Sequence, residues 1–208
     1  MFKLKYVLGK HDKAVSSIKF SPCGSFIATC GADQIINIYS SIKGTLLCLL
    51  NGNYKQGLND ILWLDIDDSK SHFSRYLAVC SDDRSISIWD ILYRKIVYSF
   101  QGHKGYVFCL CYSERNGLLL SGSYDGTIRL WDIRDEKCIA SFDAHSEPVH
   151  SIAYNPTREH FVSTGGDGLI RTWDTITQSC LRTHVINSSP PVPSTIVNFT
   201  PSKFLFIL

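Results

Sequence analysis

A segment in the second half of this chain recurs, without a gap, 42 residues further along. Residues 102–132 read GHKGYVFCLCYSERNGLLLSGSYDGTIRLWD, and residues 144–174 read AHSEPVHSIAYNPTREHFVSTGGDGLIRTWD. Trp131 and Trp173 close these two copies, and Trp89 lies at the same interval upstream. Because self-similarity at a fixed period indicates a repeat architecture, this feature constrains the fold more than any single motif does.

Each copy is composed of short runs that favour β-strands. In one copy these runs are 107–112, 118–121 and 127–131, which are rich in aliphatic, aromatic and β-branched residues. Asn-Gly and Asp-Gly pairs separate the runs and are strong turn signals. An earlier copy spans 11–39 and ends in Tyr39 in place of a tryptophan. No segment has an apolar stripe at helical spacing, so an all-β fold is predicted.

A period of about 40–45 residues that opens on Gly-His and closes on Trp-Asp resembles a blade of a WD-repeat β-propeller. The resemblance implies a single-domain partial ring of about four blades and the start of a fifth. The predicted units within 1–208 are blades at 10–48, 52–98, 102–141 and 144–183, a partial fifth blade at 184–208 and a candidate closing strand at 3–8. We expect a truncated, alternatively spliced or mispredicted chain whose open edges promote self-association.

In this family a histidine, a serine or threonine, an aspartate and a tryptophan form a hydrogen-bonded chain, the blade network. The pattern maps onto His11, Thr29, Asp33 and Tyr39, onto His103, Ser121, Asp125 and Trp131, and onto His145, Ser163, Asp167 and Trp173. The second copy keeps Asp83 and Trp89 but has Val79 at the hydroxyl position and Asn53 near the histidine position. With an insertion around 66–74 as well, we expect this blade to have an incomplete network and the least regular structure.

The repeat also bears on whether the chain is an enzyme. His103, Ser121 and Asp125 could form a catalytic triad, but the same residue types recur at the same offsets in the next copy. A structural network repeats with every blade, whereas an active site has no reason to do so. No metal-ligand spacing is present among the remaining histidines, His72, His150, His160 and His184. A non-catalytic protein without metal or cofactor is therefore predicted.

Composition and charge argue against two further classes of protein, those that bind nucleic acid directly and those that span a membrane. The chain has a formal charge of +2 and no run of Lys or Arg longer than two residues, so direct nucleic-acid binding is not expected. No run of eighteen apolar residues is present, so no membrane span is expected. Eight single cysteines without a signal peptide indicate the cytoplasm or the nucleus, and the nucleus is expected only from the family resemblance given below. The polar run 65–70 is interpreted as a solvated loop, with a family-specific contact or phosphorylation at Ser69 or Ser71 as alternatives.

The residues between the Gly-His and Trp-Asp pairs of the repeat resemble one protein family in particular. The matching stretches are KAVSSIKFSP at 13–22, GYVFCLCY at 105–112, SGSYDGTIRLWD at 121–132, AHSEPV at 144–149 and DGLIRTWD at 167–174. They are similar to the seven-bladed WD-repeat subunit of COMPASS and MLL-type histone lysine methyltransferase complexes. The resemblance implies a scaffold for histone lysine-4 methylation, with methyltransferase subunits and a histone-tail peptide as partners. The alternative is a WD-repeat adaptor in RNA processing or a ubiquitin-ligase substrate receptor.

That family takes an arginine-containing peptide into the mouth of its central channel, with the guanidinium between two phenylalanines. The resemblance implies peptide-binding roles for Phe108, Ala32, Asp82, Tyr124, Asn59 and His150. From its alternating strand alone, Phe108 would be a packed core aromatic, and Tyr124 would face solvent before its turn. The chain departs from the family at Gly166, where a rim tyrosine is expected, and at Asn59, which replaces a small hydroxyl residue. The second phenylalanine belongs to a blade beyond Leu208.

Overall fold

The fold is built from antiparallel strands. The computed structural model describes residues 3–65, 75–114, 116–155 and 159–185 with their side chains, and residues 196–199 and 204–207 as backbone. Within these ranges there is no helix, and hence none long and apolar enough to cross a membrane. The described residues form four four-stranded sheets and one two-stranded sheet. The predicted all-β propeller fragment of about four blades is confirmed.

Each sheet is a meander of consecutive strands. The first contains β1 (Val15–Phe20), β2 (Phe26–Gly31), β3 (Ile35–Ser40) and β4 (Leu46–Asn51). The second contains β5 (Leu58–Leu64), β6 (Tyr76–Ser81), β7 (Ile86–Asp90) and β8 (Lys95–Phe100). The third contains β9 (Val107–Ser113), β10 (Leu118–Ser123), β11 (Thr127–Asp132) and β12 (Lys137–Asp143). The fourth contains β13 (Val149–Tyr154), β14 (His160–Gly165), β15 (Leu169–Asp174) and β16 (Ser179–Val185), and β17 (Ile196–Phe199) pairs with β18 (Phe204–Ile207).

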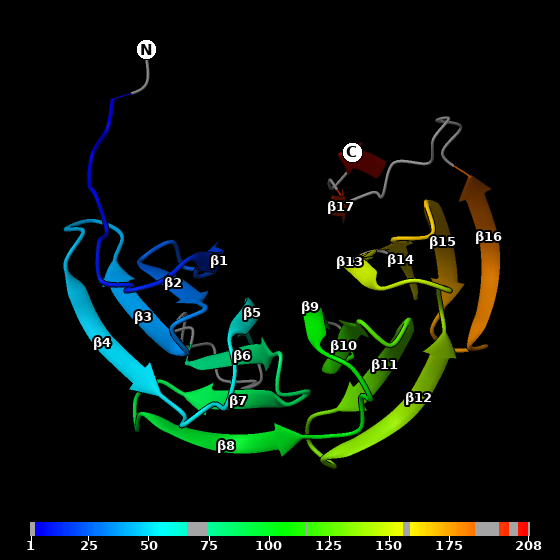
Figure 1. The fold of residues 1–208 in the computed structure, drawn as a ribbon, viewed down its shortest axis with the longest axis horizontal. Helices are drawn as coiled ribbons and strands as arrows, with labels where there is room; N and C mark the ends of the chain where they lie inside the picture. Colours follow the sequence, from blue (N-terminus) through cyan, green and yellow to red (C-terminus); the bar gives the residue numbers. More distant parts are fainter. Residues whose placement is uncertain are drawn as a thin grey trace.

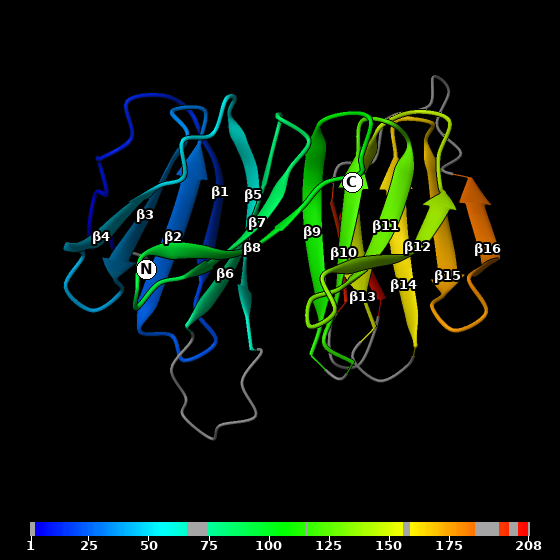
Figure 2. The ribbon, with the colours of Figure 1, turned by 90° about the horizontal axis from the view of Figure 1, so that it is seen from below.

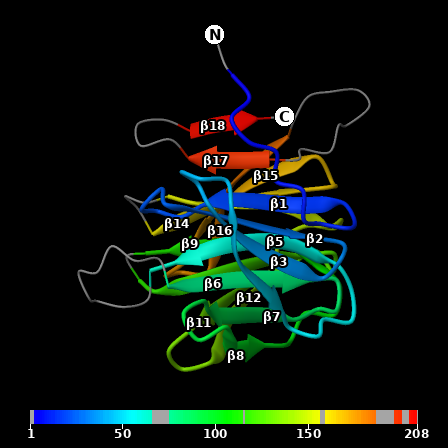
Figure 3. The same ribbon diagram turned by 90° about the vertical axis from the view of Figure 1, so that its left-hand side faces the viewer.

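The sheets are arranged as blades around an open arc (Figure 1). The first strands of the blades, β1, β5, β9 and β13, lie nearest the axis, and the fourth strands lie on the outside. Neighbouring first strands contact one another, and β17 contacts β13 as the inner strand of a further unit. Figures 2 and 3 show that the inner strands extend along one direction, so the turns gather at two opposite ends of the molecule.

The apolar core lies between the blades rather than within them. Trp89 belongs to a buried cluster shared with β2, β3 and β4 of the preceding blade. Trp131 packs on Phe100 with ring centroids 5.4 Å apart, and Trp173 packs on Phe142 at 5.6 Å. Because each closing tryptophan fills the face of the blade before it, every blade depends on its neighbour for burial.

The repeat is visible in backbone details that composition does not reveal. In each blade the register between the third and fourth strands shifts immediately before the closing aromatic residue, Tyr39, Trp89, Trp131 or Trp173. Such a shift is a β-bulge, which bends and twists the strand. The turn that follows has one residue at positive φ in each blade: Gly44 at 66°, Arg94 at 54°, Glu136 at 55° and Gln178 at 54°.

The strand pairing of the second blade is more regular than the sequence predicts. Its strands pair in the same antiparallel order as the others, with the same shift before Trp89. The insertion around 66–74, with Ser69, Ser71 and His72, lies outside the described residues. Residues 3–8, the candidate closing strand, have no strand conformation in this structure. Tyr6 instead packs against the β3–β4 turn, where its hydroxyl donates to the carbonyl oxygen of Ile42.

Four cysteines within strands, Cys30, Cys48, Cys80 and Cys109, are buried thiols, whereas Cys138 and Cys180 are exposed. Burial raises the pKa of Cys30 to about 12 and raises the pKa values of Cys80 and Cys109 well above the ordinary value. None of the eight cysteines, all of which lie in the described ranges, forms a disulfide. Since the thiolate is the reactive form, these buried side chains act as small apolar residues of the core.

Candidate interaction site at the propeller rim

A complete blade network positions the turn between β10 and β11. The Nε2 atom of His103 lies 2.7 Å from the Ser121 hydroxyl, and its Nδ1 atom lies 3.2 Å from an Asp125 carboxylate oxygen. The indole nitrogen of Trp131 donates to the same hydroxyl at 2.8 Å. Burial lowers the pKa of His103. Burial acts to raise the pKa of Asp125, but hydrogen bonds from Thr127 and from the amide of residue 104 lower it to about 2.

The fourth blade repeats this arrangement almost atom for atom. His145 contacts Ser163 at 2.8 Å and Asp167 at 2.8 Å, and Trp173 donates to Ser163 at 2.9 Å. Burial lowers the pKa of His145. Since the two networks have the same contacts, their geometry is that of a repeated structural element.

The first blade keeps part of the network. His11 contacts Thr29 at 2.7 Å and Asp33 at 2.9 Å. Tyr39 is buried, but its hydroxyl has no hydrogen-bond partner among the described residues. The tyrosine therefore fills the space of a tryptophan without reproducing its N–H contact.

In the second blade, the closing tryptophan has an acceptor that the sequence analysis missed. The hydroxyl of Tyr54 accepts a hydrogen bond from the indole nitrogen of Trp89 at 2.7 Å and also contacts the hydroxyl of Ser87. Burial raises the pKa of Tyr54 to about 12. Asn53, which lies near the histidine position, makes only a local contact to Asn51. Among the described residues no hydrogen bond joins Tyr54 to Asp83, so the chain of His, Ser or Thr, Asp and Trp is incomplete in this blade, although the tyrosine supplies an acceptor for Trp89 where His and Ser are absent.

Asp83 retains the role of the network aspartate in this blade. It accepts hydrogen bonds from the amide nitrogen of Ser85 at 3.0 Å and of Lys55 at 3.4 Å. Val79, at the hydroxyl position, is fully buried in the cluster that contains Trp89. The histidine and the serine or threonine of the other networks are thus replaced by Tyr54 and by the apolar packing of Val79. The signal available in the sequence was the proximity of Tyr54 to the histidine position.

One backbone hydrogen bond, repeated in all four blades, builds a rim at one end of the inner strands. The amide of the residue before each network aspartate donates to the carbonyl just upstream of the inner strand. The pairs are Ala32 to Ala14 at 2.9 Å, Asp82 to Gly57 at 3.0 Å, Tyr124 to Tyr106 at 2.8 Å and Gly166 to Pro148 at 2.9 Å. The network thus fixes these turns at the same end of the inner strands, which makes Ala32, Asp82, Tyr124 and Gly166 equivalent rim positions.

An aromatic cluster lies at this rim between the third and fourth blades. The rings of Phe108 and His150 have centroids 6.5 Å apart and planes only 11° from parallel. Tyr124 meets Phe108 edge to face at 6.0 Å, and Tyr106 lies 6.5 Å from Phe108. Phe108 is half-buried and lies outside the apolar clusters between blades. Tyr124 is 57% exposed, so the cluster is open to a ligand.

A carboxylate adjoins the aromatic cluster from the second blade. The side-chain amide of Asn59 donates to Asp82 at 2.7 Å and to the carbonyl of Val107 at 2.9 Å. Val107 precedes Phe108, so this amide holds Asp82 beside the strand that carries the aromatic ring. Ala32, at the next rim position, lies close to Gly57 and presents no polar side chain.

At the rim, aromatic faces lie beside the carboxylate of Asp82. Aromatic faces and carboxylates together attract cations. Among the residues described with side chains, no group of three or more His, Cys, Asp or Glu could hold a metal ion. The arrangement is therefore suited to recognising a cationic side chain.

Comparison with protein families matches the chain to the WD domain, G-beta repeat (WD40), at residues 2–40, 45–90, 94–132 and 136–174. These segments cover well over half of the chain. The protein belongs to the WD40-repeat family. WD40 proteins are in general non-catalytic scaffolds that mediate protein–protein interactions.

Several curated proteins resemble part of this WD40 chain. WD repeat-containing protein 1 of Rattus norvegicus is 34% identical over 101 residues, covering 48% of this chain and 16% of that protein. DDB1- and CUL4-associated factor 10 of Homo sapiens is 27% identical over 124 residues, covering 58% of this chain and 20% of that protein. The chain thus matches about a fifth or less of these relatives. They support a WD-repeat protein, and the narrower resemblance to a methyltransferase-complex subunit stays a prediction.

Proposed function

We propose that this WD40 protein is an interaction scaffold that captures an arginine-containing peptide at the rim between its second, third and fourth blades. The observation that carries the proposal is the near-parallel pair of Phe108 and His150, with Asp82 held beside it. A peptide crossing the rim would place an arginine side chain against these rings and a backbone N–H group against the carboxylate.

Arginine fits this site better than lysine does. Its guanidinium is planar and stacks on aromatic faces, whereas the ammonium of lysine is a compact, strongly hydrated charge. A cation over an aromatic face contributes about 0.5–2 kcal/mol. The oxygen of Asp82 that does not accept from Asn59 is available for a further hydrogen bond. The site would therefore select a ligand by the planar shape of its guanidinium and by its positive charge.

The resemblance of residues 105–112 and 121–132 to the WD-repeat subunit of histone methyltransferase complexes supports a nuclear scaffold. Its partners would be methyltransferase subunits and a histone-tail peptide, and it would support methylation of histone lysine 4. Phe108, Asp82 and Tyr124 stand at the family's peptide-binding positions, and these residues surround the rim cluster in this structure.

The test is a titration of a fluorescent arginine-containing histone-tail peptide with the whole chain. Arg-to-Ala and Arg-to-Lys peptides are the ligand controls. Phe108→Ala should weaken binding about tenfold, within the usual range for an aromatic contact to a cation. Tyr93→Ala, which removes an exposed ring far from the rim, should leave binding unchanged. Equal affinity for all three peptides, or no loss in a folded Phe108→Ala protein, would contradict the proposal.

A second candidate is an adaptor of a ubiquitin ligase, because one relative is a DDB1- and CUL4-associated factor. This function would use a surface for a ligase subunit and needs no arginine selectivity. Co-migration of the chain with purified DDB1 in size-exclusion chromatography, together with indifference to the arginine peptide, would favour the adaptor over the methyltransferase scaffold.

A further inference from the structure

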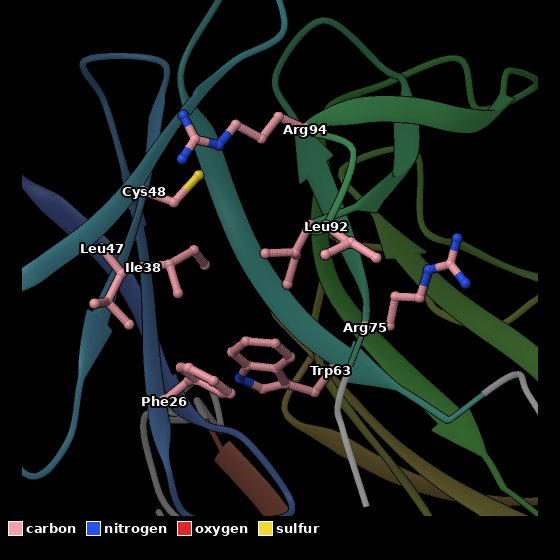
Figure 4. A pocket seen from close by; sticks show the side chains of 9 residues that line it. Phe26, Ile38, Leu47, Cys48, Trp63, Arg75, Leu92 and Arg94 are labelled. Carbon is pink, nitrogen blue, oxygen red and sulfur yellow. The ribbon is translucent and has the colours of Figure 1, made fainter. Parts of the chain in front are cut away.

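A groove opens between the first and second blades, at the end of the strands opposite the rim. Phe26 begins β2, whose far end leads to the rim, and Trp63 lies near the end of β5, which starts at the rim. These two rings form one end of a cavity of 220 Å³. In Figure 4, Leu47 and Ile38 of the first blade face Leu92 of the second across this space, and Arg94 lies next to Cys48.

The groove combines a buried apolar floor with exposed apolar walls. Ile38 is 2% and Trp63 6% exposed, whereas Leu47 is 47% and Leu92 64% exposed. Contiguous exposed apolar surface around a depression is typical of an interaction site. The volume is below the roughly 300–1,000 Å³ of pockets for drug-sized molecules. The groove is therefore suited to one bulky side chain rather than to a cofactor.

Two arginines, Arg75 and Arg94, line the groove, and they differ in whether a carboxylate is paired with them. The guanidinium of Arg75 is paired with Asp90, with its Nε atom 2.8 Å from the carboxylate, and lies over the ring of Tyr93. Arg94 makes no ion pair among the residues described with side chains. Its position at the mouth of an apolar cavity favours an anionic group close to whatever side chain fills the floor.

We propose that this groove docks a short segment of a partner protein in which one bulky apolar side chain lies next to carboxylates. The apolar side chain packs on Phe26 and Trp63, and a neighbouring carboxylate pairs with Arg94. Interfaces of this kind place an apolar anchor at the centre and a charged residue at the edge. The site is independent of the rim, since it uses the opposite end of the strands and other residues.

The equivalent turns of the later blades provide variants that suit the local backbone. Arg94 has φ of 54°, and Glu136 has φ of 55° at the same place in the third blade. Arg94→Glu therefore reverses the charge with a side chain that this turn already accommodates. Arg134→Glu makes the same charge change at an exposed site in the third blade. Leu92→Ser removes a wall of the groove, and Ile176→Ser, at the equivalent exposed position of the fourth blade, is its control.

The experiment titrates the full chain with a fluorescent acidic heptapeptide that has one central phenylalanine. Matched peptides have a central serine, or lysines in place of the acidic residues. Arg94→Glu and Leu92→Ser should each weaken binding about fivefold or more, the effect of an exposed ion pair or a lost apolar contact. Arg134→Glu, Ile176→Ser and Phe108→Ala should bind like the unaltered protein.

Three outcomes would overturn the proposal. These are no binding of the acidic phenylalanine peptide, equal binding of all three peptides, and equal losses in the groove variants and their controls. Sedimentation velocity identifies the competing occupant. If the chain self-associates and Leu92→Ser abolishes that association, a second copy fills the groove instead of an acidic segment.

Discussion

At the scale of single residues, the closing aromatic of each blade needs an acceptor for its polar atom. Trp131 and Trp173 donate to serine hydroxyls, and Trp89 donates to the hydroxyl of Tyr54. A buried N–H group without a partner costs about 1–3 kcal/mol. Each tryptophan therefore has a hydroxyl acceptor, which a serine provides in two blades and a tyrosine in a third. Tyr39 is the exception, since its buried hydroxyl has no hydrogen-bond partner among the described residues.

Tyr54→Phe should therefore destabilise the protein although the ring is retained. The indole nitrogen of Trp89 and the hydroxyl of Ser87 both lose a partner, and the expected loss is about 1–3 kcal/mol in the free energy of unfolding. Urea denaturation followed by tryptophan fluorescence measures this change. Tyr93→Phe, at an exposed ring, is the matched control and should change little. Equal stability of the two variants would show that Tyr54 is not part of a network.

The buried histidines make stability depend on pH. Burial lowers the pKa values of His103 and His145 below 6.5. As the pH falls below about 6.5, the unfolded chain binds protons that the folded protein does not, so the free energy of unfolding decreases. Each histidine can contribute at most about 1.4 kcal/mol per pH unit, and the effect ends at its folded-state pKa.

Urea unfolding at pH 7.5, 6.5 and 5.5 checks this dependence. A variant with His103→Gln and His145→Gln should be less stable at pH 7.5 but should lose less stability on acidification. The aspartates with lowered pKa values, such as Asp125, act only at lower pH, because their stabilisation is lost as the pH falls from 3.8 towards about 2. An unchanged pH dependence in the double variant would contradict the assignment to these histidines.

At the scale of elements, the turns between the second and third strands repeat one backbone conformation with different residues. Gln34 has φ of 69° and Arg84 71°, whereas Gly126 has 76° and Gly168 73°. The left-handed region costs about 1–2 kcal/mol for a residue with a Cβ. Two blades tolerate that strain, and two avoid it with glycine.

Substitutions at these turns should have opposite signs. Gly126→Ala would place a Cβ atom 2.3 Å from the carbonyl oxygen of His145 at a left-handed φ, so we expect a loss of about 2 kcal/mol or more. Gln34→Gly should be neutral or stabilising by up to about 1 kcal/mol, because relief of strain exceeds the entropy that glycine adds to the unfolded chain. Thermal unfolding of both variants compares the two turns directly. A loss in both would mean that the side chain of Gln34 contributes more than its strain costs.

At the scale of the whole molecule, one carboxylate links three blades. Asp60 of β5 accepts hydrogen bonds from the hydroxyl of Ser17 in β1 at 2.8 Å and from the amide of Leu110 in β9 at 3.1 Å. The indole nitrogen of Trp63 adds a bond to the carbonyl of Lys19 at 3.2 Å. Together with the apolar clusters between blades, these contacts make the stability of one blade depend on the next.

Asp60→Asn should weaken this coupling, because an amide cannot accept with both of its terminal atoms. We expect a loss of about 1–3 kcal/mol in the free energy of unfolding, and faster hydrogen exchange of the amides of β1 and β9 as well as of β5. Asp135→Asn, in an exposed turn, is the control. Faster exchange confined to β5 would show that Asp60 does not couple the blades.

The repeat in the sequence was sufficient to predict the all-β class, the four blades and the positions of the networks in the third and fourth blades. These features depend on residues at constant separation within one unit, so they can be predicted from the period of 42 residues. The rim positions Ala32, Asp82 and Tyr124 did not follow from the repeat, and only the resemblance to the methyltransferase-complex subunit implied them.

The contacts between blades were decided by the tertiary structure alone. The role of Tyr54, the bridge made by Asp60 and the groove beside Trp63 all depend on which side chains of different units meet across the faces of two sheets. The same holds for the near-parallel rings of Phe108 and His150. A repeat period specifies what recurs within a blade, whereas these contacts depend on the size, twist and packing of neighbouring sheets, which do not recur.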